Sequence, residues 1–372
     1  MKTIINGRLI VPDAQGNFRV VTGKAITFGD KIISIGATPA GTEIIDAAGD
    51  FVAPGFVNVH IHGAAGVDTM DDDSNALQTL ADFLPTTGVT SFLPTTMTMP
   101  LEKIYRALER IRHAKNFSRG AKILGAHLEG PFISEKFHGA QSAANILPAN
   151  FELIKNFTDV IKIITVAPEV CGDEFIARCR ENFIVSIGHS AATYEVALAA
   201  INDGARHVTH LFNAQSGLHH RKPGIVGAAL DSNATVELIA DDVHVHPAAQ
   251  RIVAKCKPRS EIVLITDSLR ACGLGDGVIE FGGQKVFVSG NIATLADGTI
   301  AGSVAPMNHV LRNFHVNTGL DVAACVELVT KNPAVELNVY DALGSLTVGK
   351  AADIVIFNDA FNVRKTFVRG EN

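Results

Sequence analysis

The stretch FVNVHIH, residues 56–62, is an apolar run that ends in two histidines one position apart. A continuous apolar run of this length predicts a strand buried on both faces, as strands of a parallel sheet are. Because successive side chains of a strand point to opposite faces, His60 and His62 should project to the same side. Two imidazoles placed in this way can bind one metal ion. The stretch therefore predicts a parallel sheet with a metal site at the end of one strand.

Seven further segments downstream share this apolar character. Their starts follow one another at intervals of about twenty to forty residues, which leaves room for a crossover helix each time. Strands that alternate with helices predict an α/β fold, and eight such strands predict a closed, TIM-like (β/α)8 barrel. After the eighth strand, Gly282–Gly302 predicts an inserted β-hairpin. The eight predicted strands are Phe56–His62, Val89–Thr95, Lys122–Glu129, Ile161–Ala167, Phe183–His189, Arg206–His210, Thr235–Ala240 and Glu261–Asp267.

The two ends of the chain differ from the middle in their pattern of residues. Short β-rich segments interrupted by Gly, Asp and Pro, such as Lys24–Phe28 and Asp353–Phe357, lie near the start and near the end. We expect residues 1–52 and 343–372 to form one small β-sandwich domain together. Residues 53–342 should then form the barrel.

Composition excludes several classes of function. A net charge of −6 and a pI near 6.2 do not provide the basic surface that binds nucleic acid or membranes. The sequence offers no run of the ~18 apolar residues that a membrane span requires, and its first ten residues are not typical of a signal peptide. The five cysteines are scattered, without a CxxC pair, which is typical of reduced thiols. We expect a cytoplasmic protein with neither a nucleic-acid nor a membrane partner.

A histidine or a carboxylate residue ends five of the eight predicted strands. In a TIM-like barrel the active site lies at the carboxyl ends of the strands, so these residues should meet there. Each has an ordinary structural interpretation when taken alone: a histidine can be a hydrogen-bonded strand end, an aspartate can cap a turn, and a glutamate can pair with an arginine. Their coincidence on five strand ends favours a metal site. The six residues are His60, His62, Glu129, His189, His210 and Asp267.

The kinds of side chain at these positions limit the metal. Imidazole and carboxylate ligands without thiolate suit Zn²⁺ or Fe²⁺, and also Mn²⁺ or Co²⁺. Six residues exceed the three protein ligands of one catalytic zinc, so we expect two ions bridged by Glu129. In such a site the pKa of a bound water falls to about 7. Asp267 beside that water can take its proton and deliver it to a leaving amine.

The motifs around these residues are more specific. They resemble the amidohydrolase superfamily and, within it, the N-acetylglucosamine-6-phosphate deacetylases, over essentially the whole chain. The motifs that carry the resemblance are APGF (53–56), HLEGPF (127–132), GHS (188–190), THLFNA (209–214), HRKPG (220–224), IADDVH (239–244), TDS (266–268) and the closing GSLTVGKAAD (344–353).

The resemblance implies the reaction and the ligand roles. The expected activity is hydrolysis of the acetamide of N-acetylglucosamine 6-phosphate, a step of amino-sugar catabolism and cell-wall recycling. Glu129, His189 and His210 match the metal ligands that the family shares, whereas His60 and His62 match members that hold a second ion. Asp267 matches the general base and acid, and we count it among the metal ligands as well.

The resemblance also implies a set of substrate contacts. Gln141 stands where many members of the family have a histidine. Arg221 matches a residue that, in the family, reaches into the active site of the neighbouring subunit and binds the phosphate there, which implies a homodimer. His244 packed beside the seventh strand, and Arg221 in a solvated basic loop, are the ordinary alternatives for these two residues. The predicted substrate-binding residues are Ala140, Gln141, Asn213, Ala214, Arg221, His244, Ile300, Ala301 and Gly302.

Other functions remain open at this point. Deacetylation of N-acetylgalactosamine 6-phosphate differs only in the orientation of one hydroxyl, and no motif decides between the two sugars. Cyclic amidohydrolases resemble the first strand but bridge their metals with a carboxylated lysine, where this chain has Glu129. A barrel that only senses sugar phosphates is expected to have lost ligands or the base, and neither is lost here. His127, on the same strand face as Glu129, is expected to be a packed residue rather than a ligand.

Overall fold

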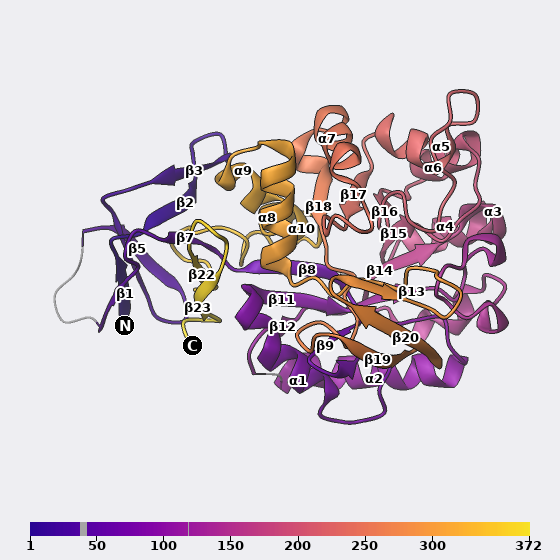
Figure 1. Cartoon of the computed structure of the whole chain (residues 1–372), viewed down its shortest axis with the longest axis horizontal. Coiled ribbons are helices and arrows are strands. Elements are labelled where there is room, and N and C mark those ends of the chain that lie inside the picture. The colour runs from indigo at the N-terminus through magenta and orange to yellow at the C-terminus, as the bar shows by residue number, and fades with distance from the viewer. Residues whose placement is uncertain (38–42, 118) are drawn as a thin grey trace.

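The computed structural model describes residues 1–37, 43–117 and 119–372. Figure 1 shows two parts side by side: a small part made of strands that carries both chain termini, and a larger part of strands and helices. Among the described residues, no helix combines the length and the apolar character needed to cross a bilayer.

The small part consists of two sheets, and strands from both ends of the chain meet in the second. Its first sheet has the order β5-β4-β1-β6 and its second has the order β23-β22-β7-β2-β3. The strands are β1 Lys2–Ile5, β2 Arg8–Pro12, β3 Phe18–Val21, β4 Ala25–Phe28, β5 Ile32–Gly36, β6 Glu43–Asp46, β7 Phe51–Pro54, β22 Ile354–Phe357 and β23 Val363–Phe367. Because β22 pairs with β7, the last thirty residues complete a sheet that the first fifty begin.

A separate apolar core holds this part together. Ile4 and Leu9 from the start of the chain pack in one cluster with Ile354 and Phe367 from its end. The rings of Phe28 and Phe367 meet edge to face with centroids 5.0 Å apart. The predicted union of the two ends is thus present. The domain boundary at residues 52 and 53 stays a prediction, and strand β7 runs across it.

All eight predicted barrel strands are present and parallel to their neighbours. The third is split in two at Gly125, where a Cβ would lie 2.6 Å from the carbonyl oxygen of Val160 and φ is +152°. Any larger residue would therefore push the third strand off the fourth. The strands are β8 Phe56–Ile61, β11 Val89–Pro94, β12 Lys122–Ile123, β13 Ala126–Glu129, β14 Ile161–Val166, β15 Ile184–Ile187, β16 His207–Val208, β17 Thr235–Leu238 and β18 Ile262–Leu264.

Backbone contacts close these strands into a ring. A single bridge between Thr95 and His127 joins β11 to β13. On the other side, the amide of Asp267 donates to the carbonyl of His60 at 3.0 Å and joins β18 to β8. The amides of Leu264 in β18 and Val57 in β8 donate instead to the carbonyls of Leu328 and Val329, so a later segment lies between the two strands there. Among the described residues, the direct backbone hydrogen bonds between the last strand and the first follow the end of β18, where the predicted ligands lie.

Helices surround the ring, and their apolar faces share one core with the strands. Several begin at a capping side chain, as Thr193 does for α5 and Asp321 for α9. The helices are α1 Ala76–Phe83, α2 Leu101–Phe117, α3 Pro168–Cys171, α4 Asp173–Arg180, α5 Tyr194–Asn202, α6 Gly224–Leu230, α7 Pro247–Cys256, α8 Met307–Thr318, α9 Val322–Glu327 and α10 Lys331–Glu336. Short 3₁₀ turns are η1 Leu84–Thr87, η2 Glu135–Phe137, η3 Ala143–Asn145, η4 Phe151–Leu153, η5 Lys155–Phe157 and η6 Arg259–Glu261.

A hairpin and a small three-stranded sheet complete the larger part. β9 (Gly63–Ala64) pairs with β10 (Val67–Asp68) directly after the first barrel strand. The insertion predicted after the eighth strand is a three-stranded antiparallel sheet. It consists of β19 (Gly277–Phe281), β20 (Gln284–Ser289) and β21 (Ile292–Thr294).

Candidate active site

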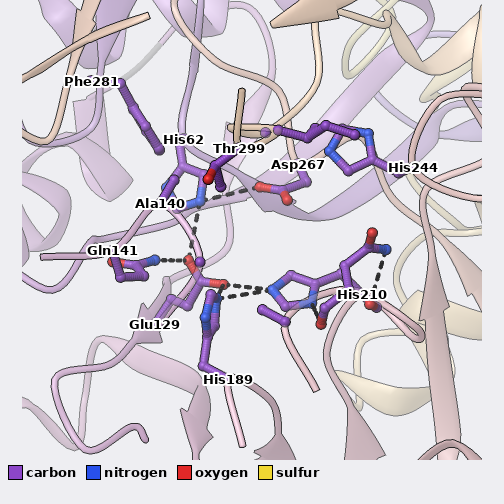
Figure 2. Close-up of a pocket in the computed structure, with 15 residues that line it drawn as sticks. His62, Glu129, Ala140, Gln141, His189, His210, His244, Asp267, Phe281 and Thr299 are labelled. Atoms are coloured by element: carbon purple, nitrogen blue, oxygen red, sulfur yellow. Dashed lines mark hydrogen bonds and ion pairs between the residues drawn. The ribbon is translucent and has the colours of Figure 1, made fainter. Parts of the chain in front are cut away.

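A cavity of about 270 Å³ opens at the carboxyl ends of the barrel strands. Figure 2 shows imidazoles and carboxylates from different strands pointing into it. Twelve of the fifteen lining residues are ones that the sequence analysis singled out. The lining residues are His62, Glu129, Gly139, Ala140, Gln141, His189, His210, Asn213, Ala214, His244, Asp267, Phe281, Thr299, Ile300 and Gly302.

Glu129 stands at the centre of the predicted ligand set. Its Oε1 lies 3.1 Å from Nε2 of His189 and 3.1 Å from Nε2 of His210. Its Oε2 lies 3.2 Å from Nε2 of His62, and Nε2 of His60 is 3.5 Å from Oε1. Two groups of possible ligands thus share this carboxylate, one with His60 and His62 and the other with His189 and His210. The strand ends bring together all the residues that the sequence predicts as ligands.

Backbone turns aim several of these side chains. His189, His210 and Asp267 have φ angles of +47°, +30° and +48°, in or next to the left-handed region. Non-glycine residues in such conformations cost about 1–3 kcal/mol each and persist only where surrounding structure fixes them. Each follows the last residue of a barrel strand by two or three positions. The strained turns therefore redirect side chains from the strand direction into the cavity.

The four histidines present the same nitrogen to the cavity. Nδ1 of His62 lies 3.2 Å from the carbonyl of Thr95, and Nδ1 of His189 lies 3.0 Å from that of Phe137. Nδ1 of His210 lies 3.1 Å from a carbonyl oxygen as well, and Nδ1 of His60 lies 2.9 Å from a carboxylate oxygen. Because these oxygens can only accept, each Nδ1 carries the proton and each Nε2 is free to bind a cation. Metal-binding histidines are held in this way.

The inner atoms of the cluster lack partners of their own. Nε2 of His60 and Oδ1 of Asp267 are buried without a hydrogen-bond partner among the described residues, at 3.4 Å from each other. Burial lowers the pKa of His62, but the carboxylates of Asp267 and Glu129, each 3.2 Å from its Nε2, outweigh burial and raise it to about 9. The carboxylates thus create a strong preference for positive charge at this place. A divalent cation would satisfy both the charge and the unpaired atoms, so the side chains present fit a metal ion.

His244 lies on the same side of the cavity as Asp267, away from Gln141 (Figure 2). Its Nδ1 lies 2.7 Å from Oδ2 of Asp241, which also accepts the His244 amide through Oδ1 at 2.8 Å. Burial lowers the pKa of His244, but Asp241 outweighs burial and raises it. A ring protonated on both nitrogens can donate from Nε2 to an oxygen in the cavity.

Gln141 is engaged at both ends of its amide. Its Nε2 donates to Oε2 of Glu129 at 2.6 Å, and its Oε1 accepts from the backbone amide of Thr98 at 2.7 Å. Gln141 lines the cavity, as expected of a substrate contact, and it also holds the Glu129 carboxylate in position. The substrate contact stays a prediction.

The remaining predicted substrate contacts divide into two groups. Ala140, Asn213, Ala214, Ile300 and Gly302 line the cavity. Two predicted residues do not. Ala301 is fully buried, with its amide bonded to the carbonyl of Ala293, and Arg221 lies on an exposed loop before α6.

Three cavity residues escaped the sequence analysis: Gly139, Phe281 and Thr299. Phe281 comes from β19 of the inserted sheet, and its ring centroid lies 5.2 Å from that of His62. Nothing in the local sequence indicates this contact, because it depends on how the insertion folds back. Gly139 belongs to a loop that the resemblance does mark, and a Cβ there would lie 3.4 Å from Cε1 of His189.

His127 lies below the cavity. Its Nδ1 is 3.0 Å from the carbonyl of Val59 and its Nε2 is 2.7 Å from Oγ1 of Thr165. Burial and the neighbouring His60 lower its pKa to about 3, so the ring is neutral. Both nitrogens have partners, as expected of a packed residue.

Comparison with known proteins agrees with this geometry. The model of the amidohydrolase family matches residues 51–372. The chain belongs to the amidohydrolase family. It is 42% identical to N-acetylglucosamine-6-phosphate deacetylase of Bacillus subtilis over 345 residues, which covers 89% of this chain and 87% of that protein. It is 36% identical to N-acetylgalactosamine-6-phosphate deacetylase of Escherichia coli O157:H7, with 90% of both chains covered.

Comparison with solved structures agrees with the similarity in sequence. The crystal structure of N-acetylglucosamine-6-phosphate deacetylase from Pasteurella multocida superimposes with a TM-score of 0.94 at 32% identity, covering 100% of this chain and 98% of that one. The predicted resemblance and the predicted α/β barrel with its small β part are therefore confirmed.

Proposed function

We propose that the protein is a metal-dependent deacetylase that hydrolyses the acetamide of N-acetyl-D-glucosamine 6-phosphate to D-glucosamine 6-phosphate and acetate. The observation that carries the proposal is the sharing of Glu129 between two groups of histidines at the mouth of the barrel, with Asp267 beside His60 and His62 of one group. The similarity to deacetylases over about 90% of the chain supports the choice of substrate.

The proposed cofactor is a pair of divalent ions, Zn²⁺ or Fe²⁺ in the first place, with Mn²⁺ or Co²⁺ as alternatives. Glu129, His189 and His210 would hold one ion. His60 and His62 would hold the second, with Glu129 shared by the two groups and Asp267 beside His60 and His62. Such a bound metal polarises a carbonyl oxygen and lowers the pKa of a water.

The protonation steps belong to the chain's own residues. Asp267 accepts a proton from the water whose oxygen bonds to the acetyl carbon, and it then gives that proton to the amine nitrogen as the carbon–nitrogen bond breaks. Burial raises the pKa of Asp267, but His60 and His62 outweigh burial and lower it, which keeps the carboxylate ionised and able to act as the base. His244, when protonated on both nitrogens beside Asp241, would donate from Nε2 to the substrate oxygen where negative charge develops.

The second candidate substrate is N-acetylgalactosamine 6-phosphate. The observation that favours it is the relative of that name at 36% identity. A cyclic amidohydrolase activity is less well supported, since Glu129 takes the place where those enzymes use a carboxylated lysine and the cavity lining contains no lysine. A sensor without activity is not supported, because the predicted ligands and base are all gathered in the cavity.

The proposal extends to the assembly and to the compartment. Arg221 would meet the phosphate of a neighbouring subunit's substrate, within a homodimer. All five cysteines are free thiols, as in reducing compartments, so we propose that the protein acts in the cytoplasm.

Acetate release tests the proposal. Metal-free protein and protein reloaded with Zn²⁺ or Fe²⁺ are each given four sugars: N-acetylglucosamine and N-acetylgalactosamine, with and without the 6-phosphate. We expect metal-dependent release that is fastest with N-acetylglucosamine 6-phosphate. Faster release from the galactosamine compound would select the second candidate. No release from any of them by metal-loaded protein would overturn the proposal.

A further inference from the structure

A fully buried carboxylate lies beneath the cavity, outside its lining. Glu237 belongs to β17, a strand that supplies no predicted metal ligand, and its exposed fraction is 0%. Its neighbours Val236 and Leu238 are apolar and equally buried. Removing a carboxylate from water costs several kcal/mol unless charged or hydrogen-bonding partners compensate. The partners of Glu237 therefore show what this residue is placed to do.

One oxygen of Glu237 holds two of the predicted metal ligands. Its Oε2 lies 2.9 Å from Nδ1 of His60 and accepts the backbone amide of His210 at 3.1 Å. The first contact fixes the imidazole with Nε2 toward the cavity. The second fixes a backbone that has the strained φ of +30°. His60 and His210 belong to different ligand groups, so one carboxylate oxygen connects the two halves of the site.

His60 differs from the other three histidines in this respect. Nδ1 of His62, His189 and His210 faces a backbone carbonyl, whereas Nδ1 of His60 faces a carboxylate. A charged acceptor forms a stronger hydrogen bond than a neutral one and makes the opposite nitrogen a better electron donor. His60 is thus the histidine whose binding to metal depends most on a single side chain.

The second oxygen of Glu237 is held from the opposite side. Its Oε1 lies at ion-pair distance, 3.1 Å, from Nε2 of His207, although neither atom has a hydrogen-bond partner among the described residues, and Nδ1 of His207 lies 2.6 Å from Oε1 of Glu336. Glu336 ends α10 and lines a surface hollow together with Ile184 and Arg206, at the amino ends of β15 and β16. A chain of charged groups therefore runs from the metal site to the other end of the barrel. The contact between Oε1 and His207 does not by itself account for the two contacts of Oε2, with His60 and with the His210 amide.

We propose that Glu237 is a positioning residue that fixes one ligand of each metal group, His60 through its side chain and His210 through its backbone, and that His207 and Glu336 hold Glu237 in that position. The proposal rests on the metal site proposed above. It predicts that Glu237 controls metal affinity although it does not touch the metal.

The test compares two buried glutamates of the same barrel. Glu237→Gln removes the charge at nearly constant shape. Glu327→Gln is the matched control, because Glu327 is 2% exposed and pairs with Arg259 at 3.1 Å, on α9 and away from the cavity. Zn²⁺ affinity is measured on metal-free protein by competition with a chromophoric chelator. We expect Glu237→Gln to bind Zn²⁺ about 10–100-fold more weakly than wild type, as is typical when a partner of a metal ligand is lost. We expect the control to stay within about twofold of wild type.

Equal affinity of Glu237→Gln and wild type would overturn the proposal. A second measurement tests the connection between the two groups. In a His60→Asn background, Glu237→Leu should still weaken Zn²⁺ binding, because leucine has no oxygen to accept the His210 amide and that contact is lost. No further loss would limit Glu237 to His60 and overturn the claim that it serves both groups.

Two controls distinguish a loss of metal affinity from a failure to fold and from a failure of the proposed function. Urea midpoints of the metal-free proteins show whether each variant folds. Should Glu237→Gln not fold, Glu237→Asp keeps the charge but is one methylene too short for all its contacts, and the same loss of affinity is expected. Wild-type protein that binds Zn²⁺ but releases no acetate would overturn the proposed function and leave the positioning test valid. Active wild type with an unaffected Glu237→Gln would overturn only the positioning role.

Discussion

The metal-ligand cluster and the loop of residues 217–224 are built in opposite ways. His60, Glu129 and Asp267 are 0%, 1% and 8% exposed, and each lies within 3.5 Å of a polar side chain from the end of another strand. Arg221 is exposed, and its hydrogen bonds are with His219 and His220 of its own loop. The barrel therefore prepares the reacting centre within one chain. The group expected to bind the phosphate is left free to meet something outside that chain.

The largest effect should come from the prepared centre. Replacing the proposed base, Asp267→Asn, removes the proton acceptor at nearly constant shape. We expect turnover to fall by about 10²–10⁴-fold, the range for a lost acid–base group, while most of the metal stays bound. Steady-state kinetics with N-acetylglucosamine 6-phosphate and elemental analysis of the same samples measure both quantities.

Two other outcomes would change the interpretation of Asp267. Near-normal turnover would remove it from proton transfer. Loss of metal in parallel with activity would make it chiefly a ligand, a role that its contacts of 3.4 Å and 3.2 Å with Nε2 of His60 and His62 also allow.

The exposed loop should give a smaller and more selective effect. Arg221→Ala should lower kcat/KM for the phosphorylated sugar by about 10–100-fold, since one hydrogen bond to a charged group contributes about 1.5–3 kcal/mol. The unphosphorylated sugar should be almost unaffected. Lys222→Ala, which removes a charge from the next position of the same loop, is the matched control and should discriminate less. An equal loss for both sugars would exclude Arg221 as the phosphate ligand.

Mixed subunits test whether Arg221 acts across an interface. Hybrids of Arg221→Ala with Asp267→Asn contain one site that has an intact Asp267 and an intact arginine from the partner. Activity should therefore partly return on mixing. Hybrids that stay inactive after confirmed subunit exchange would place the arginine in its own subunit's site.

The third prediction concerns the number of ions that the prepared centre holds. Wild-type protein should take up two divalent ions per subunit, and the double variant His60→Gln/His62→Asn should take up one, because Glu129, His189 and His210 remain. Elemental analysis after loading and gel filtration counts them. Saturation at one ion in both proteins would mean that the second group of ligands does not bind metal.

The sequence predicted the prepared centre better than its surroundings. Period-two alternation places His60 and His62 on one face of a strand, and barrel topology then brings the other strand ends to them, so local rules suffice. Phe281 could not be predicted in this way, since its contact with His62 depends on how an inserted sheet folds back over the cavity. Arg221 was found only through resemblance, and its role depends on a second chain that one sequence does not describe.

The sequence analysis also assigned no role to the buried polar residues Glu237 and His207 below the cavity. Glu237 lies within an apolar strand and His207 at the start of another, where isolated polar residues have many explanations. Their meaning depends on distances across three strands, such as the 3.1 Å between His207 and Glu237, which no spacing in the sequence specifies.

The smallest expected effect lies in this buried layer and concerns stability rather than catalysis. Burial lowers the pKa of His207, but Glu336 and Glu237 outweigh burial and raise it to about 10, whereas an unfolded histidine titrates near 6.5. A group whose pKa is raised by folding stabilises the folded state fully below the unfolded value, and this contribution is lost as the pH rises through the folded value. The charged His207 should therefore stabilise the protein at pH 6.5 and cease to do so above about pH 10.

Urea unfolding of metal-free wild type and His207→Gln between pH 6.5 and pH 10 measures this effect. The comparison removes the contribution of His62, whose pKa is also raised, because both proteins contain it. We expect the wild type to have the higher free energy of unfolding near neutral pH and its advantage to shrink as the pH rises. A constant difference across this range would mean that His207 does not carry the extra proton, and that Glu237 is held by packing rather than by charge. Glu237 and His207 would then be held by packing, like the apolar residues around them, and they would differ from the exposed loop of residues 217–224 only in being buried.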